Sequence, residues 1–165
     1  VQIGMRHVSL STCGLVDKIY ALMERKLQLT LSISLHAPND ELRSRLMPVN
    51  HKWPVDELLK ACRAYTAATG RRISFEYAMI AGVNDTDACA LELADKLKGM
   101  LCHVNLIPAN EVAGKAHRRS SQNRLQAFCD ILGKKGINVT VRRTLGADIN
   151  ASCGQLRRQT EQQQT

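Results

Sequence analysis

Apolar and polar residues alternate along parts of this chain with the period of a strand. The clearest case is 27–36, where every second residue is leucine or isoleucine. Other apolar stretches of similar length are bounded by turn residues and are also predicted to be strands. The predicted strands cover 6–12, 27–36, 71–80, 102–108 and 137–144.

Between these strands, apolar residues recur at helical spacing, as Val16, Ile19, Tyr20 and Met23 do. Proline or serine at the start and glycine after the end mark several of these segments as complete helices. A shorter helix is predicted after His36, begun by an asparagine cap and ended by a proline. The predicted helices cover 14–25, 54–70, 85–99 and 120–136, with the short one between Asn39 and Pro48.

Strand and helix therefore alternate, and the connections are long enough for crossover helices, which predicts an α/β fold with a parallel sheet. No glycine-rich phosphate loop follows the first strand, so a part of a (β/α) barrel fits better than a dinucleotide-binding fold. We expect residues 1–145 to form this barrel portion, 146–156 to form a mobile loop, and 157–165 to be a polar tail.

Composition narrows the class of protein. The formal charge is +8 and the isoelectric point is near 9.4, which fits a nucleic acid partner and a generally basic protein about equally. No apolar run has the length of a membrane span and no secretory leader opens the chain, so we expect a cytoplasmic protein without a membrane partner. The first residue is Val1 rather than methionine, which suggests a fragment of a longer protein.

None of the cysteines forms a CxxC or CxxxC pair, so this chain offers no zinc or iron–sulfur ligand set, and we predict no metal ligands in it. Most of these thiols are expected to be buried apolar residues. Cys153 differs because it lies among small residues outside any apolar segment. It is either an accessible reactive thiol or an incidental cysteine in a frayed tail. The cysteines are Cys13, Cys62, Cys89, Cys102, Cys129 and Cys153.

Small polar residues follow each predicted strand, where (β/α) barrels carry their chemistry. They suggest a lined pocket, although singly they could be caps or turns, and His36 could be a structural histidine. Glu76 lies inside a strand, so its carboxylate needs a cavity or a partner such as Arg71, Arg72 or Arg142. Arg118 and its neighbour Arg119 lie in a predicted loop and are candidate phosphate contacts.

Several longer segments together carry a family resemblance. The chain resembles the C-terminal half of the RlmN-type adenine-C2 RNA methyltransferases, which belong to the radical S-adenosylmethionine superfamily. The resemblance runs from about Arg6 to Leu156. The segments that carry it are LSISLHAPNDELRSRLMPVN, FEYAMIAGVND, CHVNLIPAN, RRSS, and VTVRRT followed by CGQL.

This resemblance implies the C-terminal part of a radical S-adenosylmethionine barrel that methylates C2 of adenine in 23S rRNA and tRNA. It implies S-adenosylmethionine and a [4Fe-4S] cluster as cofactors. Cys153 would be the catalytic cysteine that carries the methyl group. The residues implied to contact S-adenosylmethionine are Ser11, Ser34, Leu35, His36 and Asn110.

The chain also departs from the family pattern. It lacks the CxxxCxxC cluster motif, the glycine–glutamate stretch, the second catalytic cysteine and the N-terminal RNA-binding domain. In the loop, Ala147 and Asn150 replace two residues that are usually acidic. We therefore expect the chain to need a missing N-terminal half and to be inactive alone. The alternatives are a truncated, non-catalytic RNA-binding module that keeps only the basic surface and, more remotely, an unrelated half-barrel enzyme.

Overall fold

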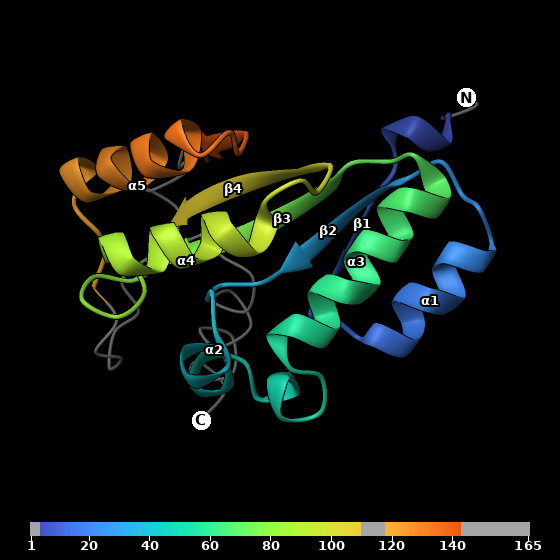
Figure 1. The fold of residues 1–165 in the computed structure, drawn as a ribbon, viewed down its shortest axis with the longest axis horizontal. Helices are drawn as coiled ribbons and strands as arrows, with labels where there is room; N and C mark the ends of the chain where they lie inside the picture. Colours follow the sequence, from blue (N-terminus) through green and yellow to red (C-terminus); the bar gives the residue numbers. More distant parts are fainter. Residues whose placement is uncertain (1–3, 110–117, 143–165) are drawn as a thin grey trace, which may run out of the picture.

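The computed structural model describes residues 4–109 and 118–142. Within them, five parallel strands form one sheet whose spatial order follows the sequence, β1-β2-β3-β4-β5 (Figure 1). The strands are β1 (Ser9–Thr12), β2 (Thr30–Ser34), β3 (Ile73–Met79), β4 (Cys102–Pro108) and β5 (Val139–Val141).

Helices connect consecutive strands. The α-helices are α1 (Val16–Glu24), α2 (Asp40–Leu46), α3 (Val55–Thr69), α4 (Asp87–Leu97) and α5 (Gln122–Lys134). Two 3-10 turns, η1 (Met5–His7) and η2 (Pro48–His51), precede β1 and follow α2. No helix among the described residues is long and apolar enough to cross a bilayer.

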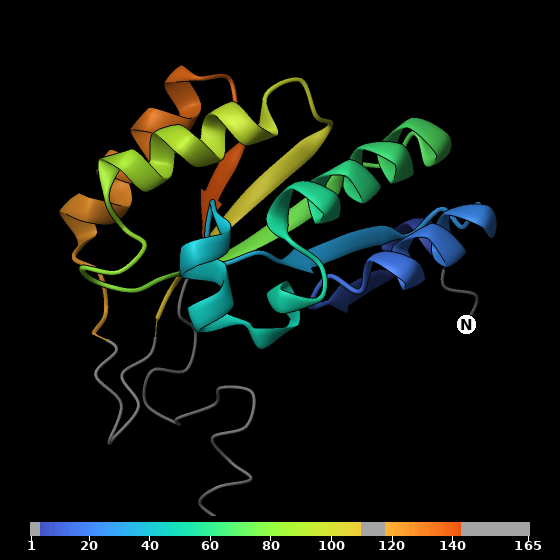
Figure 2. The same ribbon diagram turned by 60° about the horizontal axis from the view of Figure 1, so that its bottom comes forward.

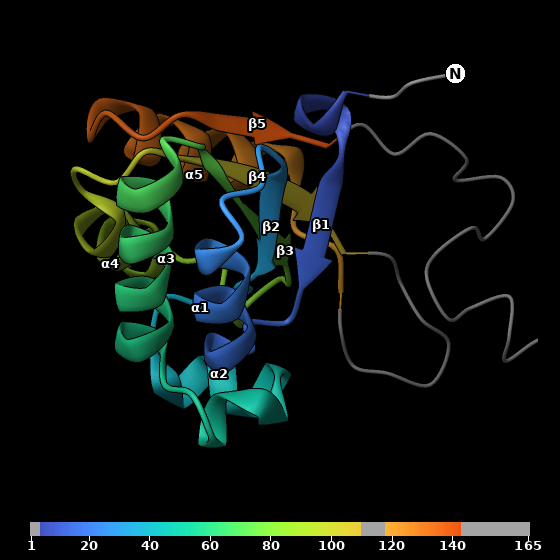
Figure 3. The same cartoon turned by 90° about the vertical axis from the view of Figure 1, so that its right-hand side faces the viewer.

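The long helices α1, α3, α4 and α5 cover one face of the sheet (Figures 1 and 3). Because the strand order never reverses, right-handed crossovers bring every connecting helix to the same side. The core lies between this helical layer and the sheet, with Ile33, Phe75, Tyr77 and Val104 fully buried. The sheet residues that alternate with them point to the opposite face, as in the wall of a barrel.

The short helix α2 and the turn η2 lie beyond the carboxyl end of β2, in the segment that leads from β2 to α3 (Figure 2). Asn39 begins α2 as predicted, because its side-chain oxygen accepts the Leu42 backbone N–H at 3.1 Å. The predicted α/β fold with a parallel sheet is confirmed. This arrangement gives the sheet one packed face and leaves its other face for chemistry.

The ends of two predicted strands are wrong in detail. Residues 5–7 form the turn η1, and the second strand begins at Thr30 rather than at residue 27. The alternation of leucines extends back to residue 27, but the hydrogen bonds between β1 and β2 do not. They start at the pair of Ser9 and Thr30, because β1 begins only at Ser9. Apolar alternation records which side chains face the core, whereas strand length depends on where a neighbouring strand supplies hydrogen bonds.

Candidate functional site

The described residues among the predicted cofactor contacts lie on two adjacent strand ends. Ser11 is near the end of β1, Ser34 ends β2, and Leu35 and His36 follow directly. Ser11 is paired with Ser32, so both strands present hydroxyl groups to the face opposite the helices. The structure thus brings these residues together at the carboxyl edge of the sheet, where barrel enzymes have their active sites.

Leu35 differs from the others because its side chain is fully buried in the core. Its backbone N–H donates to the Glu76 carbonyl at 3.0 Å, and its carbonyl accepts from the Arg43 guanidinium at 3.2 Å. Only the second lone pair of that carbonyl is left for a ligand. The role of Leu35 at this edge is therefore mainly to fix the path of the backbone between Ser34 and His36.

A buried arginine, which no sequence pattern pointed out, holds these strand ends together. Arg43 is 0% exposed, and its guanidinium donates to the carbonyls of Cys13 at 2.7 Å, Ser34 at 3.2 Å and Leu35 at 3.2 Å. A fourth bond runs to the side-chain oxygen of Asn50 at 3.0 Å. One planar cation therefore fixes the distance between the end of β1 and the end of β2.

His36 has a left-handed backbone, with φ of 60°, and its ring turns back onto β3. Its Nδ1 accepts the backbone N–H of Ala78 at 3.0 Å. Burial, and then the charge of Arg43, lowers the pKa of His36 to about 4. The ring is therefore neutral at physiological pH, with its proton on Nε2, and it can offer a ligand one N–H donor.

Asn84, in the loop after β3, is a second residue whose role sequence reasoning missed. It is 0% exposed, and its side-chain oxygen accepts the Ile80 backbone N–H at 2.8 Å. Its amide donates to the carbonyls of His36 and Ala78, each at 2.7 Å. An amide can donate and accept at once, so Asn84 closes the loop after β3 onto the segment that carries His36.

Polar side chains continue across the face of the sheet that the helices leave uncovered. In register with Ser34 are Glu76, Asn105 and Thr140, one from each following strand. An ion pair between Glu76 and an arginine, one of the alternatives that the sequence left open, is absent from the described residues, where the ion pairs involve other side chains. Glu76 instead accepts hydrogen bonds from Ser74 and Asn105.

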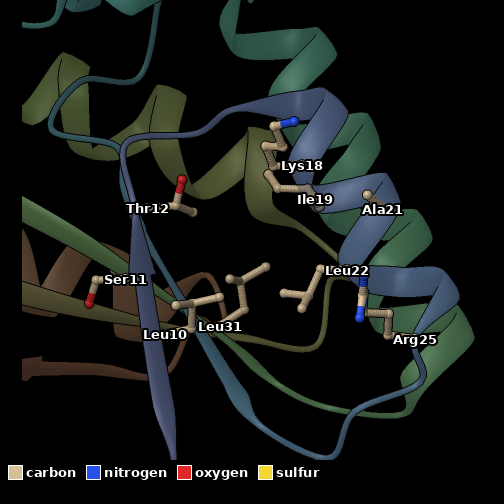
Figure 4. Close-up of a pocket in the computed structure, with 9 residues that line it drawn as sticks. All are labelled: Leu10, Ser11, Thr12, Lys18, Ile19, Ala21, Leu22, Arg25 and Leu31. Atoms are coloured by element: carbon tan, nitrogen blue, oxygen red, sulfur yellow. The ribbon is translucent and has the colours of Figure 1, made fainter.

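An apolar groove lies elsewhere on the described residues. A groove of about 380 Å³ runs between β1 and α1 and is lined by residues that include Leu10, Ile19, Leu22 and Leu31. Ser11 borders it but points away from the apolar side chains, across β1 (Figure 4). Leu10 is 45% exposed on this edge strand. The groove offers apolar contact and no catalytic group, so it is not the predicted polar pocket.

Most of the cysteine thiols among the described residues are poor nucleophiles, because they are buried. Cys62, Cys89 and Cys102 are buried as predicted, and burial raises the pKa of Cys62 to about 12 and that of Cys102 to about 11. Cys13 is exposed. No group of three His, Cys, Asp or Glu side chains within residues 4–109 and 118–142 could hold a metal ion. The two other predicted site residues, Asn110 and Cys153, lie outside the described residues.

Comparison with known proteins finds similar sequences, although no protein-family model matches the chain. The sequence is 55% identical over 158 residues to a probable dual-specificity RNA methyltransferase RlmN from Clostridium tetani. It is 57% identical over 158 residues to the protein of the same name from Alkaliphilus oremlandii. In each case the match covers 96% of this chain.

This chain matches the C-terminal half of RlmN proteins. It spans about half the length of these relatives, 45% and 46% of their sequences, as the C-terminal half of such a protein would. Among solved structures, a radical SAM methyltransferase from Sphaerobacter thermophilus superposes with a TM-score of 0.89 at 51% identity, over 93% of this chain and 45% of that one. The fold is thus part of a radical SAM barrel.

A more distant structure shares only the fold. It is a domain of pyruvate-formate lyase-activating enzyme from Bacteroides vulgatus, with a TM-score of 0.64 at 18% identity, over 82% of this chain and 80% of that one. S-adenosylmethionine, the cofactor that this fold family implies, fits the donor set at the carboxyl edge of this sheet. Ser11 and Ser34 offer hydroxyls and His36 offers an imidazole N–H, all suited to a polar, uncharged ribose.

Proposed function

We propose that this chain is the C-terminal part of an enzyme that methylates C2 of adenine in 23S rRNA and tRNA, using S-adenosylmethionine. The family match and the carboxyl edge of the sheet support this proposal. The observation that carries it is that Ser11, Ser34 and His36 lie at the carboxyl ends of two adjacent strands, and that Arg43 and Asn84 fix the backbone there.

In this proposal the described residues bind and orient the cofactor. Ser11 and Ser34 hydrogen-bond its polar parts, the neutral ring of His36 donates from Nε2, and Asn110 contributes a further polar contact. S-adenosylmethionine supplies the methyl group and, together with a [4Fe-4S] cluster bound by the missing N-terminal half, radical chemistry. We propose no ligands of this cluster in the present chain.

Cys153 is the proposed methyl carrier. A thiol is a strong nucleophile once deprotonated, and its sulfur can hold a methyl group as a thioether before the carbon passes to the base. A carrier must reach the methyl donor and then the RNA, so a cysteine in the loop 146–156 suits the task better than the buried Cys62 or Cys102.

RNA recognition is proposed to use the basic surface. Arg118 and Arg119 are exposed, and they lie beside the end of β3, where the Arg118 carbonyl accepts the Ala81 backbone N–H at 2.9 Å. Guanidinium groups there would meet RNA phosphates next to the site. The enzyme is proposed to act in the cytoplasm.

The missing N-terminal half is proposed to cover the open edge of the sheet. Among the described residues, β1 has a neighbouring strand only on the β2 side, and Leu10 and Val8 are exposed near it. An unpaired strand edge beside an apolar groove favours association with another segment. We therefore expect this chain alone to lack methyltransferase activity.

The test is direct. The full-length protein that contains this chain, with its cluster reconstituted, is incubated with methyl-labelled S-adenosylmethionine and either a 23S rRNA fragment or tRNA. Digestion to nucleosides should yield labelled 2-methyladenosine from at least one RNA, and none from the 165-residue chain alone. If the full-length protein binds S-adenosylmethionine but forms no labelled 2-methyladenosine with either RNA, the proposed reaction is wrong.

A further inference from the structure

Glu76 is the one acidic side chain on the uncovered face of the central strand, among the described residues. Its neighbours in sequence, Phe75 and Tyr77, point into the core and are 0% exposed. Glu76 alternates with them, so its partly buried carboxylate faces away from the helices. A carboxylate in that position must be hydrogen-bonded, because an unpaired buried charge is costly.

Two neutral donors hold this carboxylate in place. One oxygen accepts the Ser74 hydroxyl at 3.1 Å, and the other accepts the Asn105 side-chain amide at 2.8 Å. Asn105 is held in turn by Thr140, whose hydroxyl lies 3.4 Å from its amide oxygen. No ion pair among the described residues involves Glu76. A carboxylate can accept about four hydrogen bonds, so roughly two positions remain for a ligand.

The strand register places this acceptor beside the proposed cofactor contacts. Ser34 is the direct partner of Glu76 on the neighbouring strand, and the Glu76 carbonyl receives the backbone N–H groups of Leu35 and His36 at 3.0 and 3.3 Å. Adjacent strands lie about 4.8 Å apart. A ligand that contacts the Ser34 hydroxyl is therefore within reach of the Glu76 side chain.

We propose that the Glu76 carboxylate binds S-adenosylmethionine by accepting hydrogen bonds from the two hydroxyl groups of its ribose; this proposal rests on the function proposed above. A vicinal diol presents two O–H donors side by side, which matches two remaining acceptor positions on one fixed carboxylate. An ammonium group would instead present three N–H donors, which do not match two acceptor positions. Riboses within an RNA strand have an esterified 3′ oxygen, so the diol belongs to the cofactor.

Glu76→Gln is the informative variant. Glutamine keeps the shape of the side chain, its oxygen can still accept from Asn105, and its amide can donate to the Ser74 hydroxyl. The internal network survives, whereas one acceptor position and the negative charge are lost. The matched control is Glu57→Gln, a change on the exposed surface of α3. Thermal unfolding of both variants should match the wild type and shows that each remains folded.

Binding is measured by equilibrium dialysis with the full-length, cluster-loaded protein. The probes are S-adenosylmethionine, S-adenosylhomocysteine, which has no sulfonium charge, and the 2′-deoxy and 3′-deoxy analogues of S-adenosylhomocysteine. In the wild type, removal of either hydroxyl should weaken binding about ten- to hundred-fold, as expected for hydrogen bonds to a charged group. Glu76→Gln should weaken the binding of both parent compounds to a similar extent, and it should bind at least one of the two deoxy analogues within about twofold of its parent.

Three results would overturn the proposal. The first is wild-type protein that binds the deoxy analogues as tightly as the parent, a result that needs no variant. The second is Glu76→Gln protein that loses affinity for S-adenosylmethionine alone, because the carboxylate would then act on the sulfonium charge. The third is Glu76→Gln protein with wild-type affinity for both. If the wild type binds neither parent compound, the proposed function fails as well.

Discussion

The neutral state of His36 leads to a prediction about how stability depends on pH. The ring accepts the Ala78 N–H at Nδ1 and lies close to the buried Arg43 cation, so protonation would break a hydrogen bond and add a like charge. The replacement His36→Asn removes the titration. Asparagine offers an acceptor oxygen near the position of Nδ1 and tolerates the left-handed backbone better than most residues.

The magnitude follows from the two protonation equilibria. In the unfolded chain His36 takes up a proton as the pH falls through about 6.5, whereas in the folded chain its pKa is lowered to about 4. The contribution of His36 to the free energy of unfolding is therefore fully present above pH 6.5, and it falls as the pH decreases from 6.5 to 4. No further loss from this group occurs below pH 4. The difference corresponds to about 3 kcal/mol, since one pKa unit equals about 1.4 kcal/mol.

The assay is urea unfolding of the 165-residue chain, followed by circular dichroism at several pH values between 7.5 and 4. The wild type should lose about 3 kcal/mol more than His36→Asn across this range, while changes shared by both proteins cancel. His51→Asn, on the exposed turn η2, is the control and should keep the wild-type profile. Equal slopes for the wild type and His36→Asn would refute the assignment of a neutral, buried imidazole.

Two other predictions concern groups that the structure buries. Arg43→Lys keeps the charge but cannot span two strand ends with one planar group, so it should lower the free energy of unfolding by about 2–4 kcal/mol. It should also raise the Kd for S-adenosylmethionine in the full-length protein, whereas the exposed Arg45→Lys should change neither, as denaturation and dialysis would show. Alkylation by iodoacetamide under native conditions, read by peptide mass spectrometry, should label the exposed Cys13 well before the buried Cys62 and Cys102. Cys62 and Cys102 should react only after unfolding, because they are buried with raised pKa values, and fast labelling of either would contradict the core described above.

Much of the fold could be predicted from the sequence because its signals are local. Alternating leucines, helix caps and glycines after helices each report the state of a few neighbouring residues, and the alternation of strand and helix then favours a parallel sheet. The strand-end rule also brought Ser11, Ser34 and His36 together correctly, because parallel strands all end at one edge.

The residues that fix the site could not be predicted in this way. Arg43 lies in a short polar helix and would pass for a surface arginine, yet it is fully buried because the ends of two strands and Asn50 converge on it. Asn84 lies in a loop where asparagine is common. Both act through contacts distant in sequence, so only the folded chain reveals them.

Glu76 shows the same limit from another side. Its place inside a strand indicates that the carboxylate needs a cavity or a partner, and Arg71, Arg72 and Arg142 are candidate partners. The strand register gives Glu76 two other partners. The residue opposite it on β4 is Asn105, and the residue two positions earlier on the same face is Ser74. A neutral pair of donors leaves the carboxylate charged and able to accept more hydrogen bonds.

The central claim is that Cys153 carries the methyl group on its way to RNA. The most direct measurement is mass spectrometry of the peptide that contains Cys153, from full-length, cluster-loaded protein isolated after incubation with methyl-labelled S-adenosylmethionine. We predict one labelled methyl group on this cysteine, and complete loss of RNA methylation in Cys153→Ala while S-adenosylmethionine still binds. Wild-type RNA methylation by Cys153→Ala would contradict the claim.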